Sequence, residues 1–364
     1  MPAACPDLAP PSAAPSAIPH RKLIRAWLAP LASRSTAYAL ALTLVDLLLL
    51  GAALTATVAF ETLPMKLLAG MAAGFVIGRL FILGHDACHQ SLTPHRRLNR
   101  WLGRLVFLPS LTPYSLWEVG HNVVHHGYTN LKGFDFVWEP RTLEAYRALP
   151  RWRRRLERVY RSGWAPWLYY LVEIWWNRLL FPNRRTMPTR RAAFFWDGVL
   201  VVAGAAAWIA GLVAAAAATG QSATLLVLTG FVLPFVFWNG MIGFVVYVHH
   251  THTGVAWYED KRRWADAQPF VSTTVHLTFR SFMGSALHHI MEHTAHHVDM
   301  SVPLYRLKRA QKLLEERLAG HIVVQPFSWR WYADTARRCK LYDFEAGCWT
   351  DFSGRRTSTP LAAG

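Results

Sequence analysis

Most of the 17 histidines in this chain fall in four short clusters that could bind metal ions. The first cluster contains His85 and His89, and the second contains His121, His125 and His126. The third and fourth clusters contribute His249, His250, His252, His288, His289, His293, His296 and His297. Imidazole nitrogen is a suitable ligand for iron, copper, zinc and nickel. The clusters therefore predict a metal centre with more candidate ligands than one ion needs.

The spacing within the clusters also points to a metal site. Residues three or four positions apart share one face of an α-helix, so His85 with His89, and His121 with His125, can point toward one ion. The same spacing relates three members of the last cluster, His293, His296 and His297. A closed zinc site uses four ligands, whereas these clusters offer about nine, which favours a dinuclear centre. The chain lacks the Glu and Glu-x-x-His pattern of soluble di-iron bundles.

Four apolar segments approach or exceed the roughly 20 residues that span a bilayer. They cover residues 37–60, 66–84, 192–219 and 223–248, and only residues 61–65 and 220–222 connect the members of each pair. Each pair is therefore expected to form a helical hairpin. The predicted fold is an all-α integral membrane protein, with four transmembrane helices in two hairpins and a helical cap that holds the histidines.

The basic residues predict the orientation of these helices. The formal net charge is +17, and arginine and lysine precede the first span, separate the hairpins and follow the fourth span, whereas the two short connections contain neither. By the positive-inside rule, both termini and all four histidine clusters are cytoplasmic, at the inner membrane if the cell is bacterial. Membrane lipids are expected partners and nucleic acid is not, because no nucleic-acid motif accompanies the charge. Histidines outside the clusters (His20, His95, His276 and His321) are interpreted as structural or solvated.

The remaining segments give a provisional division of the chain. Residues 1–34 are expected to form a flexible N-terminal arm, residues 35–320 the membrane domain and residues 321–364 a cytoplasmic tail. Two further apolar stretches, residues 101–117 and 164–181, contain proline or charged residues and are expected to be interfacial or re-entrant. The four cysteines have no paired spacing, so a disulfide framework is not expected.

The histidine clusters resemble the three histidine boxes of the membrane fatty-acid desaturase and hydroxylase superfamily, and most closely its bacterial and plant acyl-lipid desaturase branch. Residues 84–91 (GHDACHQS) resemble the first box, and residues 117–130 (WEVGHNVVHHGYTN) resemble the second. Residues 292–305 (EHTAHHVDMSVPLY) resemble the third, and residues 246–258 are similar to an additional His-Thr element. The resemblance covers about residues 38–314.

The resemblance implies a non-haem centre of two iron ions, O2 as co-substrate and a fatty acyl lipid or acyl thioester as substrate. Electrons would come from a separate donor, of ferredoxin or cytochrome type, because no His-Pro-Gly-Gly haem signature is present. The ligand set carried over from the boxes is His85, His89, His121, His125, His126, His250, His293, His296 and His297. The residues expected to support these ligands are Asp86, His249, His252, His289 and Glu292, with Asp135 and Asp299 as further candidates to accept imidazole N–H groups.

The expected reaction is the introduction of a double bond into a fatty acyl chain. One departure leaves other outcomes open, because the second box is HxxxHH, whereas HxxHH is frequent in the acyl-lipid desaturases. The alternatives are a hydroxylase, a ketolase or an alkene-forming decarboxylase on the same scaffold, and a non-enzymatic membrane metal carrier. A narrow apolar tunnel is expected near Phe81, Phe107, Trp238 and Phe244. The arginine-rich run 151–155 is interpreted as a surface for anionic lipid, an electron carrier or a phosphate-bearing acyl carrier.

Overall fold

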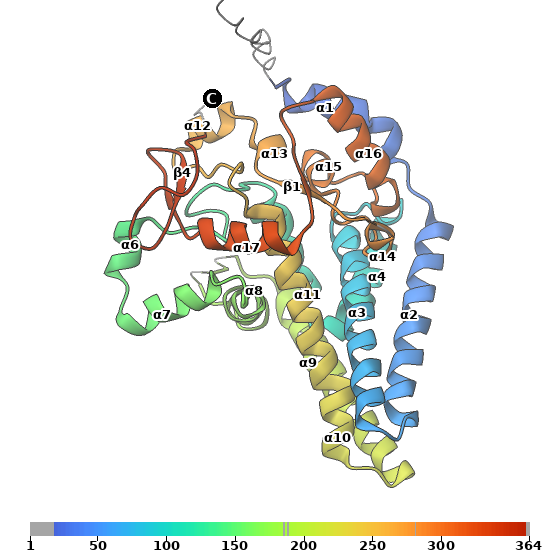
Figure 1. The fold of residues 1–364 in the computed structure, drawn as a ribbon. Coiled ribbons are helices and arrows are strands. Elements are labelled where there is room, and N and C mark those ends of the chain that lie inside the picture. Colours follow the sequence, from blue (N-terminus) through green and yellow to red (C-terminus); the bar gives the residue numbers. More distant parts are fainter. Residues whose placement is uncertain (1–17, 185, 188, 281, 362–364) are drawn as a thin grey trace, which may run out of the picture.

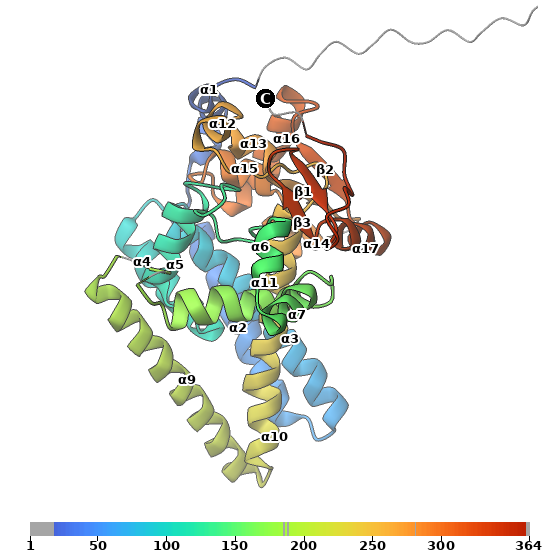
Figure 2. The same ribbon diagram turned by 90° about the vertical axis from the view of Figure 1, so that its left-hand side faces the viewer.

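The computed structural model describes residues 18–184, 186–187, 189–280 and 282–361, and it divides into a bundle of long helices and a cap of shorter elements (Figures 1 and 2). The described chain is mostly helical, which confirms the predicted fold class. Two small two-stranded sheets in the cap were not predicted.

Within the described residues, four helices are long and apolar enough to cross a membrane, and they lie in the predicted places. They are α2 (Thr36–Ala59), α3 (Leu63–Cys88), α9 (Ala192–Thr219) and a fourth made of α10 (Ala223–Val227), the π-helical η5 (Leu228–Val232) and α11 (Leu233–His250). The second and fourth helices continue past the predicted ends at residues 84 and 248. The two continuations place His85 and His250 in final helical turns that lie inside the cap.

The helix α3 is the centre of the bundle. Within its most apolar window 67% of the residues are buried, against 22% for α2 and 17% for α9. Glycines allow α3 to approach the fourth helix closely, since a Cβ atom added at Gly74 would lie 2.7 Å from the Cβ of Phe237. Small residues at such positions let membrane helices pack backbone to backbone. This packing fixes the end of α3, and with it the first histidine cluster.

The segment between the hairpins forms one part of the cap. It contains α4 (Arg96–Phe107), η2 (Leu108–Ser110), α5 (Tyr114–Glu118), the π-helical η3 (Val119–His125), α6 (Leu143–Ala148), α7 (Arg151–Tyr160), α8 (Pro166–Tyr169) and the π-helical η4 (Tyr170–Leu180). The α8–η4 helix is seen end-on in Figure 1 and lies across the long helices in Figure 2. Trp164 beside it is 90% exposed and Trp176 is 49% exposed. Both features are typical of a helix at the membrane interface.

The segment after the fourth span forms the rest of the cap. Its helices are α12 (Lys261–Asp266), α13 (Pro269–Ser272), α14 (Met283–Ala286), α15 (His293–Val298), α16 (Leu304–Arg317) and α17 (Trp329–Arg338). The strands β1 (Val275–Thr278) and β2 (Val323–Pro326) pair in parallel, with Val275 opposite Val323. The strands β3 (Leu341–Asp343) and β4 (Cys348–Thr350) pair antiparallel, with Tyr342 opposite Trp349.

The two end segments pack on the cap. Within the predicted arm, residues 21–32 form α1 (Arg21–Leu28) and η1 (Ala29–Ala32), and Ile24 and Leu28 are fully buried. This part of the predicted flexible arm is helical and packed, because α1 is amphipathic and buries its apolar side. Residues 1–17 lie outside the described residues. In the predicted tail, the Trp349 indole donates a hydrogen bond to the carbonyl of His252. The domain boundaries at residues 34 and 320 stay predictions.

Candidate metal centre

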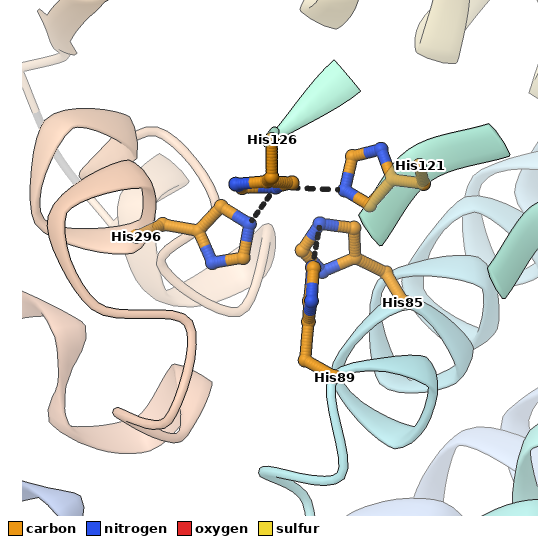
Figure 3. A group of neighbouring side chains, drawn as sticks. All are labelled: His85, His89, His121, His126 and His296. Atoms are coloured by element: carbon orange, nitrogen blue, oxygen red, sulfur yellow. Dashed lines mark hydrogen bonds between the residues drawn. The ribbon is translucent and has the colours of Figure 1, made fainter. Parts of the chain in front are cut away.

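The nine predicted ligands meet in the cap, in two adjacent groups. The first group contains His85, His89, His121, His126 and His296, and the second contains His125, His250, His293 and His297. Within each group the nitrogen atoms that could bind an ion lie within 4.8 Å of one another. Figure 3 shows the five rings of the first group converging from three separate segments of the chain. The structure therefore provides two places that could each hold one metal ion.

The second box is wound as a π-helix, and its histidines divide between the two groups. The backbone N–H of His126 donates to the carbonyl of His121 five residues earlier, at 2.9 Å, which is the hydrogen bond of a π-helix. The Nε2 atoms of His121 and His126 are 3.1 Å apart, and both rings belong to the first group. His121 and His125, which α-helical spacing was expected to direct at one ion, lie in different groups, because His125 points to the second group.

The third box also divides between the two groups. On the α-helix α15, residues four apart are separated by about 40° around the axis and residues three apart by about 60° in the opposite direction. His293 and His297 are thus neighbours, with their Nε2 atoms 3.1 Å apart. His296 turns the other way, and its Nε2 lies 3.0 Å from that of His126. The three imidazoles that were expected to converge are thus divided between the two groups, because the i+3 and i+4 directions diverge at the ends of long side chains.

The histidine rings of each group contact one another through their nitrogen atoms, as expected for a cation site with only nitrogen ligands. In each group Nε2 atoms face Nε2 atoms, as between His250 and His293 at 3.1 Å. A neutral imidazole has one N–H and one lone pair, so facing nitrogens repel unless a proton or a cation lies between them. Nitrogen ligands of this kind suit iron, and they also suit copper, zinc and nickel. The residues present therefore fit a pair of transition-metal ions.

Burial keeps these imidazoles neutral. Desolvation, reinforced by neighbouring histidines, lowers the pKa of six rings that lie outside the long helices, namely His89, His121, His126, His293, His296 and His297. A metal ligand must be in the neutral form. The site is therefore prepared for metal at neutral pH, without first losing protons.

Two polar side chains orient ligands through their other ring nitrogen. Asp135 lies 3.0 Å from Nδ1 of His125 and is itself held by the backbone N–H groups of Asn130 and Val137. The Thr129 hydroxyl lies 3.2 Å from Nδ1 of His297. Such partners fix the tautomer and the direction of the ring. Asp135 was among the predicted candidates, whereas Thr129 was not, because a threonine beside a histidine box has no distinctive spacing.

The other predicted supporting residues lie in different surroundings. The ring of His249 stacks on that of His293 at 3.9 Å, and its Nε2 contacts the sulfur of Met291. Asp86 lies beside a ligand as expected, with its Oδ1 3.4 Å from Nδ1 of His85, and its other oxygen accepts a hydrogen bond from the backbone N–H of Leu304. The remaining three supporting residues, His252, His289 and Glu292, lie outside the two groups. His252 contacts Gln325, and His289 contacts Glu292. Of the three histidines in the third cluster, only His250 belongs to one of the two groups. Asp299, which was expected to accept an imidazole N–H, forms an ion pair with Arg25.

A buried ion network fastens the segment before the third box to the bundle, and sequence reasoning missed it. Asp46 of α2 pairs with Arg79 of α3 at 2.7 Å, and its second oxygen lies 2.6 Å from Nε2 of His288. His288 and His289 both have positive φ angles, of 49° and 59°, which is uncommon for residues other than glycine. Asp46 is the only charged residue in the first span. Ionisable groups inside a membrane usually have a partner, so the sequence could have indicated that Asp46 makes such a contact.

An apolar cavity leads to both histidine groups and offers about 60 Å³. Its walls include His85 and His121 from the first group and His125, His250 and His293 from the second. The apolar part of the lining comes from the long helices, the second box and η4, and includes Phe81, Trp117, Gly120, Phe136, Ile174, Leu179, Ile242 and Val245. Of the four predicted tunnel residues only Phe81 lines this cavity. Phe107 and Trp238 pack behind Phe81, at 5.1 and 5.6 Å between ring centres, and Phe244 faces Tyr332.

Comparison with protein families places these features in context. The family model described as fatty acid desaturase matches residues 61–329. This range contains all nine predicted ligands and three of the four long apolar helices.

Individual relatives are distant in sequence. The chain is 28% identical over 275 residues to an sn-1 oleoyl-lipid 12-desaturase of Picosynechococcus, covering 75% of each protein. It is 23% identical over 291 residues to a chloroplastic omega-6 fatty acid desaturase of Glycine max, covering 76% of this chain and 63% of the relative. It is also 27% identical over 259 residues to an sn-1 acyl-lipid omega-3 desaturase (ferredoxin) of Synechocystis, covering 68% of this chain and 67% of the relative.

Proposed function

This chain belongs to the fatty acid desaturase family, and from that premise we propose that it introduces a double bond into the acyl chain of a membrane lipid. The observation that carries the proposal is the apolar cavity whose walls include histidines of both groups. A methylene chain has no polar handle, so only the shape of an apolar cavity can hold one of its carbons beside a metal centre. A metal carrier would have no use for such a cavity.

The nine clustered histidines would hold two iron ions. His85, His89, His121, His126 and His296 would bind one ion, and His125, His250, His293 and His297 would bind the other. Bound iron would supply the ability to activate O2. The residues of the chain hold the nitrogen ligands in fixed tautomers through Asp135 and Thr129, and they exclude water from the reacting carbons with an apolar wall.

The overall reaction needs an external source of electrons. Two hydrogen atoms leave adjacent carbons of the acyl chain, and together with two external electrons and two protons they reduce O2 to two molecules of water. We propose a separate electron carrier as the donor, of the ferredoxin or cytochrome type; the name of the Synechocystis relative specifies ferredoxin. The cap would face the cytoplasm, because the basic residues flank the long helices on that side.

Product analysis tests the proposed reaction. The chain should be expressed in cells that lack endogenous desaturases, and their lipids should be separated by gas chromatography with mass spectrometry. A fatty acid with one additional double bond and an unchanged number of carbons is the expected product. A hydroxy or keto product, or a shortened terminal alkene, would contradict desaturation while leaving the metal centre intact.

Replacing Asp135 with asparagine tests the orientation of His125. The amide keeps the volume of the carboxylate but can no longer offer both oxygens as acceptors, so the His125 ring loses a fixed partner. Loss of such a partner typically lowers metal affinity or activity by about 10- to 100-fold. The measurement is iron bound per chain in a competition with a chelator. Asp266→Asn, at an exposed position, is the control, and wild-type iron retention in Asp135→Asn would contradict the role.

Replacing Gly120 with leucine tests the cavity separately from the metal. A Cβ atom at Gly120 would lie 3.7 Å from the Phe136 ring, an ordinary contact, and the rest of the leucine would fill the cavity beside His121. We expect turnover of long acyl chains to fall by at least about tenfold with iron content unchanged. Gly211→Leu on the exposed side of α9 is the control. Full activity in Gly120→Leu would exclude this cavity as the acyl site.

A further inference from the structure

A second, polar cavity adjoins the apolar one. It offers about 140 Å³ and is formed by the loop after the second box together with α7, α8 and η4. Phe136 lines both cavities and therefore lies where they adjoin. The walls of the polar cavity carry four arginines, namely Arg141, Arg153, Arg161 and Arg178.

The carboxylates of this cavity pair with only some of the arginines. Glu157 contacts Arg161 at 2.6 Å and Arg141 at 3.4 Å, and Glu173 contacts Arg153 at 2.5 Å. Glu139, the third acidic residue of the lining, accepts a hydrogen bond from the backbone N–H of Gly133 instead of from an arginine. Burial raises the pKa of Glu139, which reduces the negative charge that the cavity presents. Among the described residues, the cavity therefore has more guanidinium groups than paired carboxylates.

Two of the arginines have unused donors. Arg161 is only 2% exposed, and its Nη1 is buried without a hydrogen-bond partner among the described residues. Arg178 has no carboxylate within ion-pair distance in the same part of the chain, and its guanidinium lies 4.3 Å from the centre of the Phe136 ring. A buried donor without a partner is costly, which makes it a typical place for a ligand oxygen.

From these contacts we propose that the polar cavity binds a phosphate ester carried by the acyl substrate while its acyl chain extends past Phe136 to the histidines. Phosphate oxygens match the planar fork of donors on a guanidinium, and arginine is the residue best suited to that geometry. The neighbouring Trp176 and Phe181, which are 49% and 56% exposed, would lie at the level of lipid headgroups. The inference rests on the proposed function, because it assigns the polar end of the same substrate.

Arg178→Gln is the variant that tests this site. The substitution removes the guanidinium without leaving a carboxylate unpaired, so the fold should persist. Arg309→Gln, at an exposed position on α16, removes the same charge from the surface and is the matched control. Arg178→Lys keeps a positive charge and should retain part of the binding, which separates the loss of charge from a loss of fold.

Binding is measured without turnover. Protein purified in a neutral detergent is exposed to dioleoyl phosphatidylglycerol, oleoyl coenzyme A or dioleoylglycerol, and the retained ligand is quantified by mass spectrometry. We expect the wild type and Arg309→Gln to retain a phosphate-bearing ligand at least about tenfold better than dioleoylglycerol, and Arg178→Gln to lose this preference. Stronger retention of phosphatidylglycerol identifies a phospholipid as the source of the phosphate, whereas stronger retention of the coenzyme A ester identifies an acyl thioester.

Two results would overturn the proposal. One is equal retention of dioleoylglycerol and the phosphate-bearing ligands by the wild type, and the other is an unchanged preference in Arg178→Gln. The outcome is independent of the reaction catalysed. If the phosphate preference is present but no double bond forms in cells, the proposed reaction is wrong and the anion site stands.

Discussion

Replacing His125 with alanine is expected to abolish turnover and to lower the iron content of the purified protein from about two ions per chain to about one. His125 is 2% exposed, belongs to the second histidine group and lines the apolar cavity. It thus connects metal binding to substrate binding. Because mutating even an outer-shell partner costs 10- to 100-fold, the loss of a ligand should reduce turnover by at least about 100-fold.

The control for this prediction is a histidine of the same chain that lies outside the metal centre. His95 is exposed in the turn before α4, so His95→Ala should retain wild-type iron content and turnover. Iron is measured by mass spectrometry of the purified protein and turnover by the double-bond assay. Wild-type iron content in His125→Ala would reject the assignment of this residue as a ligand. Loss of turnover with normal iron would instead limit its role to the cavity wall.

The long helices could be predicted because their cause is local. A run of apolar residues without interruption has to avoid water, whatever the rest of the chain does. The same local information was insufficient at the helix ends. Helix α3 continues through His85 to Cys88 because these residues are buried in the cap, where polar side chains find partners.

The composition of the metal centre was predictable, whereas the division of its ligands was not. His85 and His89 share a group as expected from α-helical spacing. His121 instead shares a group with His126, in a box that is wound as a π-helix and not as the expected α-helix. The three residues between His121 and His125 are thus accommodated by a wider helical turn.

Contacts between residues far apart in the chain were the least predictable part. Asp46 and His288 are 242 positions apart and lie 2.6 Å from each other. Arg21 donates to the carbonyl of His297, which ties α1 to the third box. The resemblance to a family could not have indicated such contacts, because they depend on side chains outside the histidine boxes.

The metal-free protein is expected to lose stability steeply as the pH falls below about 6.5, which is the ordinary pKa of histidine in an unfolded chain. Burial lowers the pKa of His121, His126 and His296 in the folded protein. Below pH 6.5 the unfolded chain therefore binds more protons than the folded chain, and acid favours unfolding. Above this pH the stabilisation is fully present, since both states are neutral. Each such histidine contributes a slope of about 1.4 kcal/mol per pH unit.

Bound iron should move this acid transition to lower pH, because a metal ion competes with protons for the same nitrogen atoms. The measurement is the unfolding temperature in detergent between pH 7.5 and 5.0, with and without iron. His126→Gln removes one proton-binding group from the buried cluster. In the metal-free protein, the number of protons taken up on unfolding should fall by about one, so the unfolding free energy should depend less steeply on pH. His95→Gln, at an exposed position, should leave the slope unchanged. The prediction is contradicted if the metal-free protein unfolds at the same temperature at pH 5.0 and at pH 7.5. The rings would then be protonated or solvated in the folded protein, and the clustered nitrogens would not form a site prepared for metal.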